Sequence, residues 1–251
     1  MSMGLGKFRK DLEAFMYKIM MEYYLNGAGL KETLNIQEIY KNYQHLFSID
    51  AYKWAKRELE IGDKGKERSF KVILSFIVDE HLNNSVKKLL EKYLETESRA
   101  IVKVDDEEYT FRYSQAVLAN EDSRLKRQQI YEARNNVILE ILNPILYEMW
   151  TTYHSLVQEL GYDNYLELYQ DITGIDFIEL KSIVDALSSK IEKIYIENMN
   201  QLLEENIGIK LKEAEKHDIS YIFRAKKFDQ VFRKEKMILL LKKFYKGIGV
   251  D

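Results

Sequence analysis

The sequence predicts an all-α fold, a multi-helix domain of long antiparallel helices with one small β-hairpin near residues 101–113. Three observations support this. The 251 residues include a single proline, where an average usage of about 5% would give about twelve. Apolar side chains recur at spacings of three and four through most of the chain, which is the period of an α-helix. Strict alternation of apolar and polar residues is confined to the segment after Ala100, as expected for short strands.

The N-terminal part contains three helix signals. A first helix is predicted by an apolar stripe that ends at Asn26 and Gly27 and consists of Phe8, Leu12, Phe15, Met16, Ile19, Met20 and Tyr23. A second helix should begin at Asn35, a candidate N-cap with Glu38 placed to complete a capping box. Ser48 is a candidate N-cap of the same kind for a third helix. We therefore expect short connections between these helices.

Helical spacing resumes at Phe70, after a charged loop, and continues to Tyr93. Apolar and aromatic residues then alternate with polar ones on both sides of a polar turn at 105–108, namely Val102, Val104, Tyr109, Phe111 and Tyr113. This alternation predicts the β-hairpin. A two-stranded hairpin is marginal alone, so we expect it to pack on a helix.

The segment from Leu125 to Leu160 keeps helical phase for about ten turns and predicts the central helix of the fold. We expect Leu142, Ile145 and Met149 to be fully buried at its centre. Replacement of Ile141 or Leu142 by alanine should then cost about 2 to 5 kcal/mol.

Pro144 lies inside this segment and directly follows Asn143. Proline either kinks a helix or occupies the first position of a new one. The sequence therefore predicts a kink or a helix restart with Asn143 as its N-cap.

Two further helices are predicted near the C-terminus. Asp176 and Glu179 form an Asp version of the capping box and begin a helix that ends before Gly208. A last helix is predicted from about Asp229 to Tyr245. No linker of proline, glycine or serine divides the chain, so we expect a single helical domain over residues 1–251.

Composition excludes several classes of protein. The chain has no cysteine, which rules out disulfides, thiolate metal sites and cysteine nucleophiles. A net charge of −3 does not favour a nucleic-acid binder. The longest nearly apolar run, Val72 to Val78, is far shorter than the roughly 20 residues that cross a bilayer. We expect a cytoplasmic protein with neither nucleic acid nor membrane as a partner.

Catalytic motifs are missing from the sequence. None of the four histidines lies within four residues of another, so no H-E-x-x-H helix can place two imidazoles on one zinc ion. Phosphate-binding loops and the serine nucleophile elbow are also absent. Glu80 and His81 are neighbours, but adjacent helix positions do not face each other, and we interpret the pair as a solvated helix end. We assign no catalytic, cofactor-binding or metal-binding residue, and expect the chain alone to bind no zinc and cleave no peptide.

Two compositional features leave alternatives open. The 18 tyrosines favour half-buried helix packing with hydroxyls at the rim over an aromatic cleft or interface; one of their clusters is Tyr162, Tyr165 and Tyr169. The stretch from Arg224 to Lys246 has nine basic residues against two acidic ones. A solvated helix with lysines near its negative end accounts for this stretch better than nucleic-acid binding.

The order of several segments is informative. These are EYYLNGAGL (22–30), IYKNYQHLFS (39–48), residues 73–135, residues 142–176 and HDISYIFRAKKFDQVF (217–232). The most telling pieces are LANEDSRLKR at Leu118 to Arg127, ELGYDNY at Glu159 to Tyr165, and D-I-x-x-I-F-R at Asp218 to Arg224. Their shared order resembles the helical N-terminal part of zinc oligopeptidases of the thimet oligopeptidase and oligoendopeptidase F type.

In that family the zinc ligands and the glutamate that activates water follow later, on an H-E-x-x-H helix and the helix after it. This sequence ends before such a segment. The resemblance therefore implies a non-catalytic helical portion that forms one wall of a peptide-binding channel, with zinc only in a complete parent peptidase. The alternative is a stand-alone helical scaffold that binds a peptide or a partner helix.

If the resemblance is right, a surface that should lie against the catalytic domain has no partner in this chain. We expect part of it on the last predicted helix, whose apolar stripe consists of Val231, Met237, Leu240, Leu241 and Phe244. Large exposed apolar patches seldom stay free in solution. We therefore expect a homodimer, or binding to a polypeptide that carries the catalytic half.

Overall fold

The structure, a computed structural model, describes residues 4–250 and has the predicted all-α fold with one antiparallel hairpin among these residues. The helices are α1 Leu5–Gly27, α2 Ile36–Tyr43, α3 Ile49–Ile61, α4 Glu67–Arg99, α5 Phe111–Asn120, α6 Arg124–Val137, α7 Asn143–Glu159, α8 Tyr165–Thr173, α9 Phe177–Ile207, α10 Lys216–Arg224 and α11 Met237–Gly247. The strands are β1 Ile101–Val104 and β2 Glu107–Thr110.

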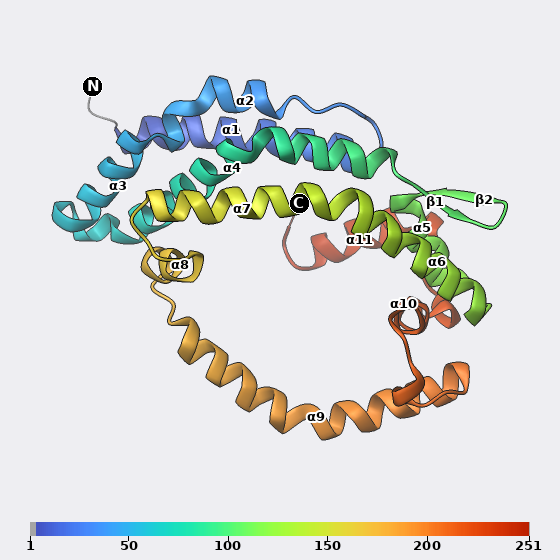
Figure 1. Ribbon diagram of the computed structural model, residues 1–251. Coiled ribbons are helices and arrows are strands. Elements are labelled where there is room, and N and C mark those ends of the chain that lie inside the picture. The colour runs from blue at the N-terminus through green and yellow to red at the C-terminus, as the bar shows by residue number, and fades with distance from the viewer. Residues whose placement is uncertain (1–3, 251) are drawn as a thin grey trace.

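Helices α1 to α8 and the hairpin form a packed body, from which α9 departs as an arc that ends beside α10 (Figure 1). Helix α4 lies at the centre of this body, since it contacts α1, α2, α3, α5, α7 and α8. The predicted central helix corresponds to α6 and α7, and α7 packs along α4. α4 takes the centre because its apolar residues are not confined to one stripe, so that neighbours pack on several of its sides; its buried set is Phe70, Ile73, Leu74, Ile77, Val78, Leu82 and Val86.

The main core of the body surrounds Phe15, which is completely buried. The ring of Phe15 lies 5.2 Å from that of Tyr40 and 5.6 Å from that of Phe47, which are favourable distances for aromatic pairs. α1, α2, α3, α4, α7 and α8 all contribute buried residues to this core. Met20, which the predicted α1 stripe includes, is exposed.

The hairpin packs on helices, as expected. Val102 and Val104 of β1 are buried against a second core formed with α5 and α6. The second strand ends at Thr110, earlier than the alternation suggested. The Thr110 hydroxyl accepts a hydrogen bond from the Tyr113 backbone N–H at 3.3 Å and thereby caps α5. Phe111 and Tyr113 therefore belong to the first turn of α5 and not to the strand.

Two of the predicted helix caps are present and one is replaced. Ser48 and Asp176 accept backbone hydrogen bonds in the first turns of α3 and α9, as predicted. α2 begins directly after Asn35, but the Asn35 side chain makes no cap hydrogen bond. The Gln37 backbone N–H instead donates to the Glu91 carboxylate of α4 at 2.9 Å. A carboxylate from another helix thus satisfies the N-terminus of α2 and takes the role of the local capping box.

Residues Ile138–Leu142 form one π-helical turn that joins α6 to α7 without a break. Pro144 lies in the first turn of α7, where its missing N–H leaves a carbonyl of the preceding turn unpaired and favours a wider turn. Asn143 has helical backbone angles and does not cap α7. Of the two predicted alternatives, the helix restart at Asn143 is therefore wrong.

The π-helical turn also changes which residues face the core. Such a turn holds one more residue than an α-turn, so the apolar stripes before and after it are out of phase. Leu142, Ile145 and Met149 are buried, as predicted, but Ile141 is 43% exposed. The prediction that Ile141 belongs to the core is wrong for this reason.

The C-terminal region differs from the prediction in one boundary. α9 ends at Gly208, which has a positive φ of 71° and closes the helix in a left-handed conformation. The last helix begins at Met237 rather than Asp229, because residues 226–236 form short 3-10 turns and bends. None of the residues of α11 is buried.

Candidate functional site

The four histidines lie in four different places. His45 contacts Asp11 at 3.1 Å, His81 bonds to the Phe47 carbonyl oxygen at 3.0 Å, His154 is exposed on α7, and His217 is buried in α10. Among residues 4–250, no three histidine, aspartate or glutamate side chains are grouped so that they could hold a metal ion.

Glu80 and His81 lie in the middle of α4, so their interpretation as a solvated helix end is wrong. The Tyr40 hydroxyl donates a hydrogen bond to the Glu80 carboxylate. Burial raises the pKa of Glu80, and the Tyr40 hydrogen bond opposes this shift. The two neighbours have separate partners, and Glu80 joins α4 to α2.

Two of the sequence pieces that carry the family resemblance meet at one point, where α10 packs against α6. Arg127 of LANEDSRLKR contacts Asp218 of D-I-x-x-I-F-R at 2.9 Å, and Arg124 contacts the same carboxylate at 3.0 Å. Arg127 and Asp218 are both fully buried. Burial alone would raise the pKa of Asp218, but hydrogen bonds from Arg124, the Glu215 backbone and Arg127 lower it on balance. We call this cluster the α6–α10 joint; it fixes the position of α10 beside the end of α9.

An aromatic patch lies where α7 meets α8, and it consists of Trp150, His154, Tyr165 and Tyr169. The rings of Tyr165 and Tyr169 stack at 4.6 Å, and Trp150 meets Tyr165 at 5.7 Å. The Tyr169 hydroxyl donates to Asp79 of α4, which fixes the stack on the body. The tyrosines are half-buried, as predicted, while Trp150 remains 49% exposed. α8 lies at the end of the body from which α9 departs (Figure 1).

Helix α9 carries a long apolar stripe, and only the C-terminal end of this stripe is covered. Met199 and Leu203 pack with Ile222 of α10. The stripe continues toward the N-terminus of α9 at helical spacing through residues that are 43–59% exposed, namely Leu180, Ile183, Val184, Leu187, Ile191 and Ile194. An apolar stripe of this kind marks the face of a helix that packs against another surface. Nothing among residues 4–250 covers this part of the stripe.

The last segment has a second exposed apolar stripe. The five residues that the sequence places on it, Val231, Met237, Leu240, Leu241 and Phe244, are 47–67% exposed. These side chains are therefore exposed, as expected, and the homodimer or catalytic-half partner stays a prediction. Basic side chains of the same stretch are exposed as well, as expected for its solvated face.

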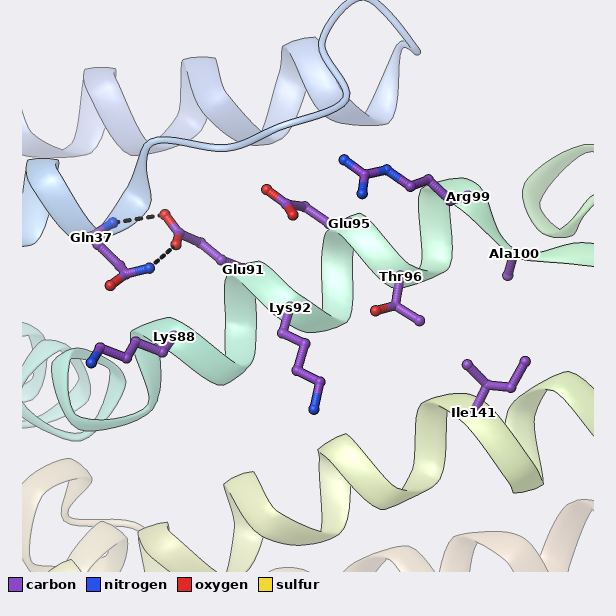
Figure 2. Close-up of a pocket in the computed structure, with 9 residues that line it drawn as sticks. All are labelled: Gln37, Lys88, Glu91, Lys92, Glu95, Thr96, Arg99, Ala100 and Ile141. Carbon is purple, nitrogen blue, oxygen red and sulfur yellow. Dashed lines mark hydrogen bonds between the residues drawn. The ribbon is translucent and has the colours of Figure 1, made fainter.

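A shallow hollow of about 540 Å³ lies between α2, α4 and the π-helical turn (Figure 2). Glu91 and Glu95 on its wall already accept hydrogen bonds from the backbone N–H groups of Gln37 and Leu34. Figure 2 shows these two carboxylates on one side of α4, and Lys92 on the side that faces the π-helical turn. These hydrogen bonds hold α2 and the residue before its cap against α4. We assign the hollow no ligand.

Comparison of the chain with models of protein families, with curated proteins and with solved structures finds no match. The resemblance to zinc oligopeptidases therefore depends on the residues of this chain alone. Among the described residues, no helix has both the length and the apolar character that crossing a bilayer requires. A cytoplasmic location stays a prediction.

Proposed function

We propose that this chain is the non-catalytic N-terminal helical portion of an oligoendopeptidase-like zinc metallopeptidase and forms one wall of a peptide-binding channel. The order of its sequence segments favours this origin. The observation that carries the proposal is the exposed stripe of α9: its C-terminal end packs against α10, while nothing in residues 4–250 covers the six apolar residues before it. A helix with this pattern is one half of an interface.

The chain's own residues do not fit a zinc site, because the four histidines lie apart and no group of three metal-binding side chains exists in the described region. In this proposal the metal and the activated water belong to the other half of the peptidase. Residues 4–250 form one wall of the channel, and they contribute to the reaction by holding a peptide against the other half.

The aromatic patch is the part of the wall best suited to contact a peptide. Trp150 and Tyr165 offer apolar ring faces, while the indole N–H and the tyrosine hydroxyl can bond to peptide carbonyl groups. Tyr169 and Asp79 hold the stack in one orientation. A fixed aromatic surface binds a side chain with little loss of conformational entropy.

The test begins with the coding region that follows Asp251. The proposal expects an H-E-x-x-H segment there, either in the same frame or in a neighbouring gene. Produced as two separate chains, the halves should form a 1:1 complex that holds one zinc ion and cleaves a fluorogenic oligopeptide, whereas residues 1–251 alone should do neither. Metal analysis and a peptidase assay measure both outcomes.

Matched variants connect this test to α9. Leu187→Asp places a charge in the exposed stripe and should abolish complex formation, whereas Ser189→Asp on the polar face should leave it unchanged. A complex that forms equally well with both variants would contradict an interface on this stripe.

The alternative function is a stand-alone helical scaffold that binds a peptide or partner helix through the same stripe. The main core of the body favours it, because residues of α1, α2, α3, α4, α7 and α8 form this core without a second half. A coding region that ends at Asp251, together with a homodimer in sedimentation that Leu187→Asp disrupts, would support the scaffold over the peptidase.

A further inference from the structure

His217 occupies an unusual position in the α6–α10 joint. It is the second residue of α10 and only 1% exposed. Its Nδ1 lies 3.5 Å from Glu215 Oε2, and its Nε2 lies 3.4 Å from Asp218 Oδ1. Neither nitrogen makes a hydrogen bond within the described part of the chain. Buried polar atoms are nearly always hydrogen-bonded, so this imidazole lacks the hydrogen bonds that usually stabilise a buried polar side chain.

The charges around His217 balance only when its ring is neutral. α6 contributes the guanidinium groups of Arg124 and Arg127, and the chain at the start of α10 contributes the carboxylates of Glu215 and Asp218. Two positive and two negative groups therefore surround the ring. Protonation adds a third positive charge beside Arg127 and Asp218, which are shielded from water, where an unbalanced charge is costly.

The other groups near the ring do not supply this missing negative charge. Tyr131 of α6 packs its ring 6.1 Å from that of His217. Asp122, at the turn before α6, is exposed and already paired with Lys226 at 2.6 Å. Asp218, the nearest carboxylate, already contacts both arginines.

We propose that His217 makes the α6–α10 joint sensitive to acid: the joint is closed while the imidazole is neutral and opens when the ring takes up a proton. This inference goes beyond the proposed function and does not depend on it. Because α10 covers Met199 and Leu203 of α9 and packs against α5 and α6, opening of the joint loosens the attachment of the far end of α9 to the body.

The direction of the pH dependence follows from linkage. Burial lowers the pKa of His217, although Asp218 and Glu215 oppose this shift. The open state, in which water surrounds the ring, has the ordinary histidine pKa of about 6.5 and binds the proton more tightly. The joint therefore stays closed above that pH. Below it, the ratio of open to closed molecules rises by up to about tenfold per pH unit.

The absence of cysteine allows two spin labels to be placed without other changes. Lys212→Cys, just before α10, and Glu132→Cys on α6 are both exposed positions. In the full chain, the distance between the labels should show one population at pH 7.5 and a second, longer one that grows between pH 6.5 and 5.5. Adding His217→Gln should remove this growth, and His45→Gln, at an exposed histidine, should retain it.

A longer population that grows equally with His217→Gln, or a single distance down to pH 5.5 in the unchanged chain, would overturn the proposal. If the joint is open at every pH in the His217→Gln variant, NMR signals of the imidazole rings in the unchanged full chain test the proposal instead. The ring of His217 should titrate with the same midpoint as the change in distance. A ring that takes up its proton while the joint stays closed also overturns it.

Discussion

Residues 177–250 form an arm beside the body of α1 to α8, and much of this arm has the helical pattern of the body with its apolar side chains exposed. In α1, Phe8, Phe15 and Ile19 are at most 3% exposed. In α9, Ile183 and Leu187 occupy equivalent positions on an apolar stripe and are 58% and 55% exposed. Helical periodicity thus shows which face of a helix is made to pack, but it does not show whether a partner is present.

The two regions are also held together by different forces. The body has a large apolar core with aromatic contacts around Phe15. The arm meets the body at α10, which packs against α5 and α6 and carries Asp218, the centre of a buried cluster of charges. Apolar cores tolerate changes of pH, whereas buried charges depend on every member of the cluster. The arm is therefore the more sensitive region.

The largest expected effect is at the joint. Asp218→Ala leaves Arg127 buried without its carboxylate partner and should destabilise the docking of α10 by about 3 to 5 kcal/mol. Hydrogen exchange of the α10 amides measures this loss. Asp229→Ala removes an exposed partner of Arg224 and is the control, with no change expected. Equal protection of α10 in both variants would show that the joint does not depend on this ion pair.

In the body, Phe15→Ala should reduce the free energy of unfolding by about 3 to 5 kcal/mol, because it leaves a cavity among packed rings. The matched change in the arm, Ile191→Ala at a half-exposed position, should cost about 0.5 kcal/mol or less. Urea unfolding followed by circular dichroism compares the two. Similar losses would mean that the stripe of α9 is covered in solution, by a second copy or by α11.

The π-helical turn makes a sharper comparison between neighbours. Leu142→Ala should cost about 2 to 5 kcal/mol, since Leu142 is 2% exposed. Ile141→Ala should cost less than about 1 kcal/mol, since Ile141 faces outward. The same unfolding measurement checks both. A large loss of stability in the Ile141→Ala variant would mean that Ile141 faces the core, as regular helical spacing predicts.

The smallest expected effect concerns Glu80. Burial raises its pKa, so the folded chain binds this proton more tightly than the unfolded chain does. Its contribution to stability is therefore lost as the pH rises from about 4.3 through the raised pKa of the folded state. Glu80→Gln keeps an acceptor for the Tyr40 hydroxyl and should flatten this fall. Stability measured at several pH values, with Glu140→Gln at an exposed position as control, tests it. An unchanged pH profile would contradict a buried carboxylate.

Local signals predicted several helix ends correctly where the cap lies within the same segment. Ser48, Asp176 and Gly208 mark helix ends through their own side chains or backbone freedom. Asn35 marks the start of α2, yet the acceptor that caps this helix is the Glu91 carboxylate. Glu91 lies 54 residues from Gln37, whose backbone N–H donates the hydrogen bond. Spacing within a segment carries no information about such a distant partner.

The candidate surfaces also differ in whether spacing within one segment could predict them. The apolar stripes of α9 and α11 were visible in the sequence because they follow helical spacing. The contact of Arg124 and Arg127 with Asp218 was not, since these residues are more than 90 positions apart in the sequence. The sequence pieces that contain them were informative as motifs, but nothing in their spacing indicated that they meet.

The sequence by itself determined the helical class, several helix ends, the hairpin and most of the apolar faces, because each depends on side chains within a few residues of one another. Only the tertiary structure decided that α4 is central, that Ile141 faces outward and that His217 lies buried between two arginines and two carboxylates. These features depend on which distant segments meet. The free energy of such contacts depends on burial and charge, which exist only after the chain has folded.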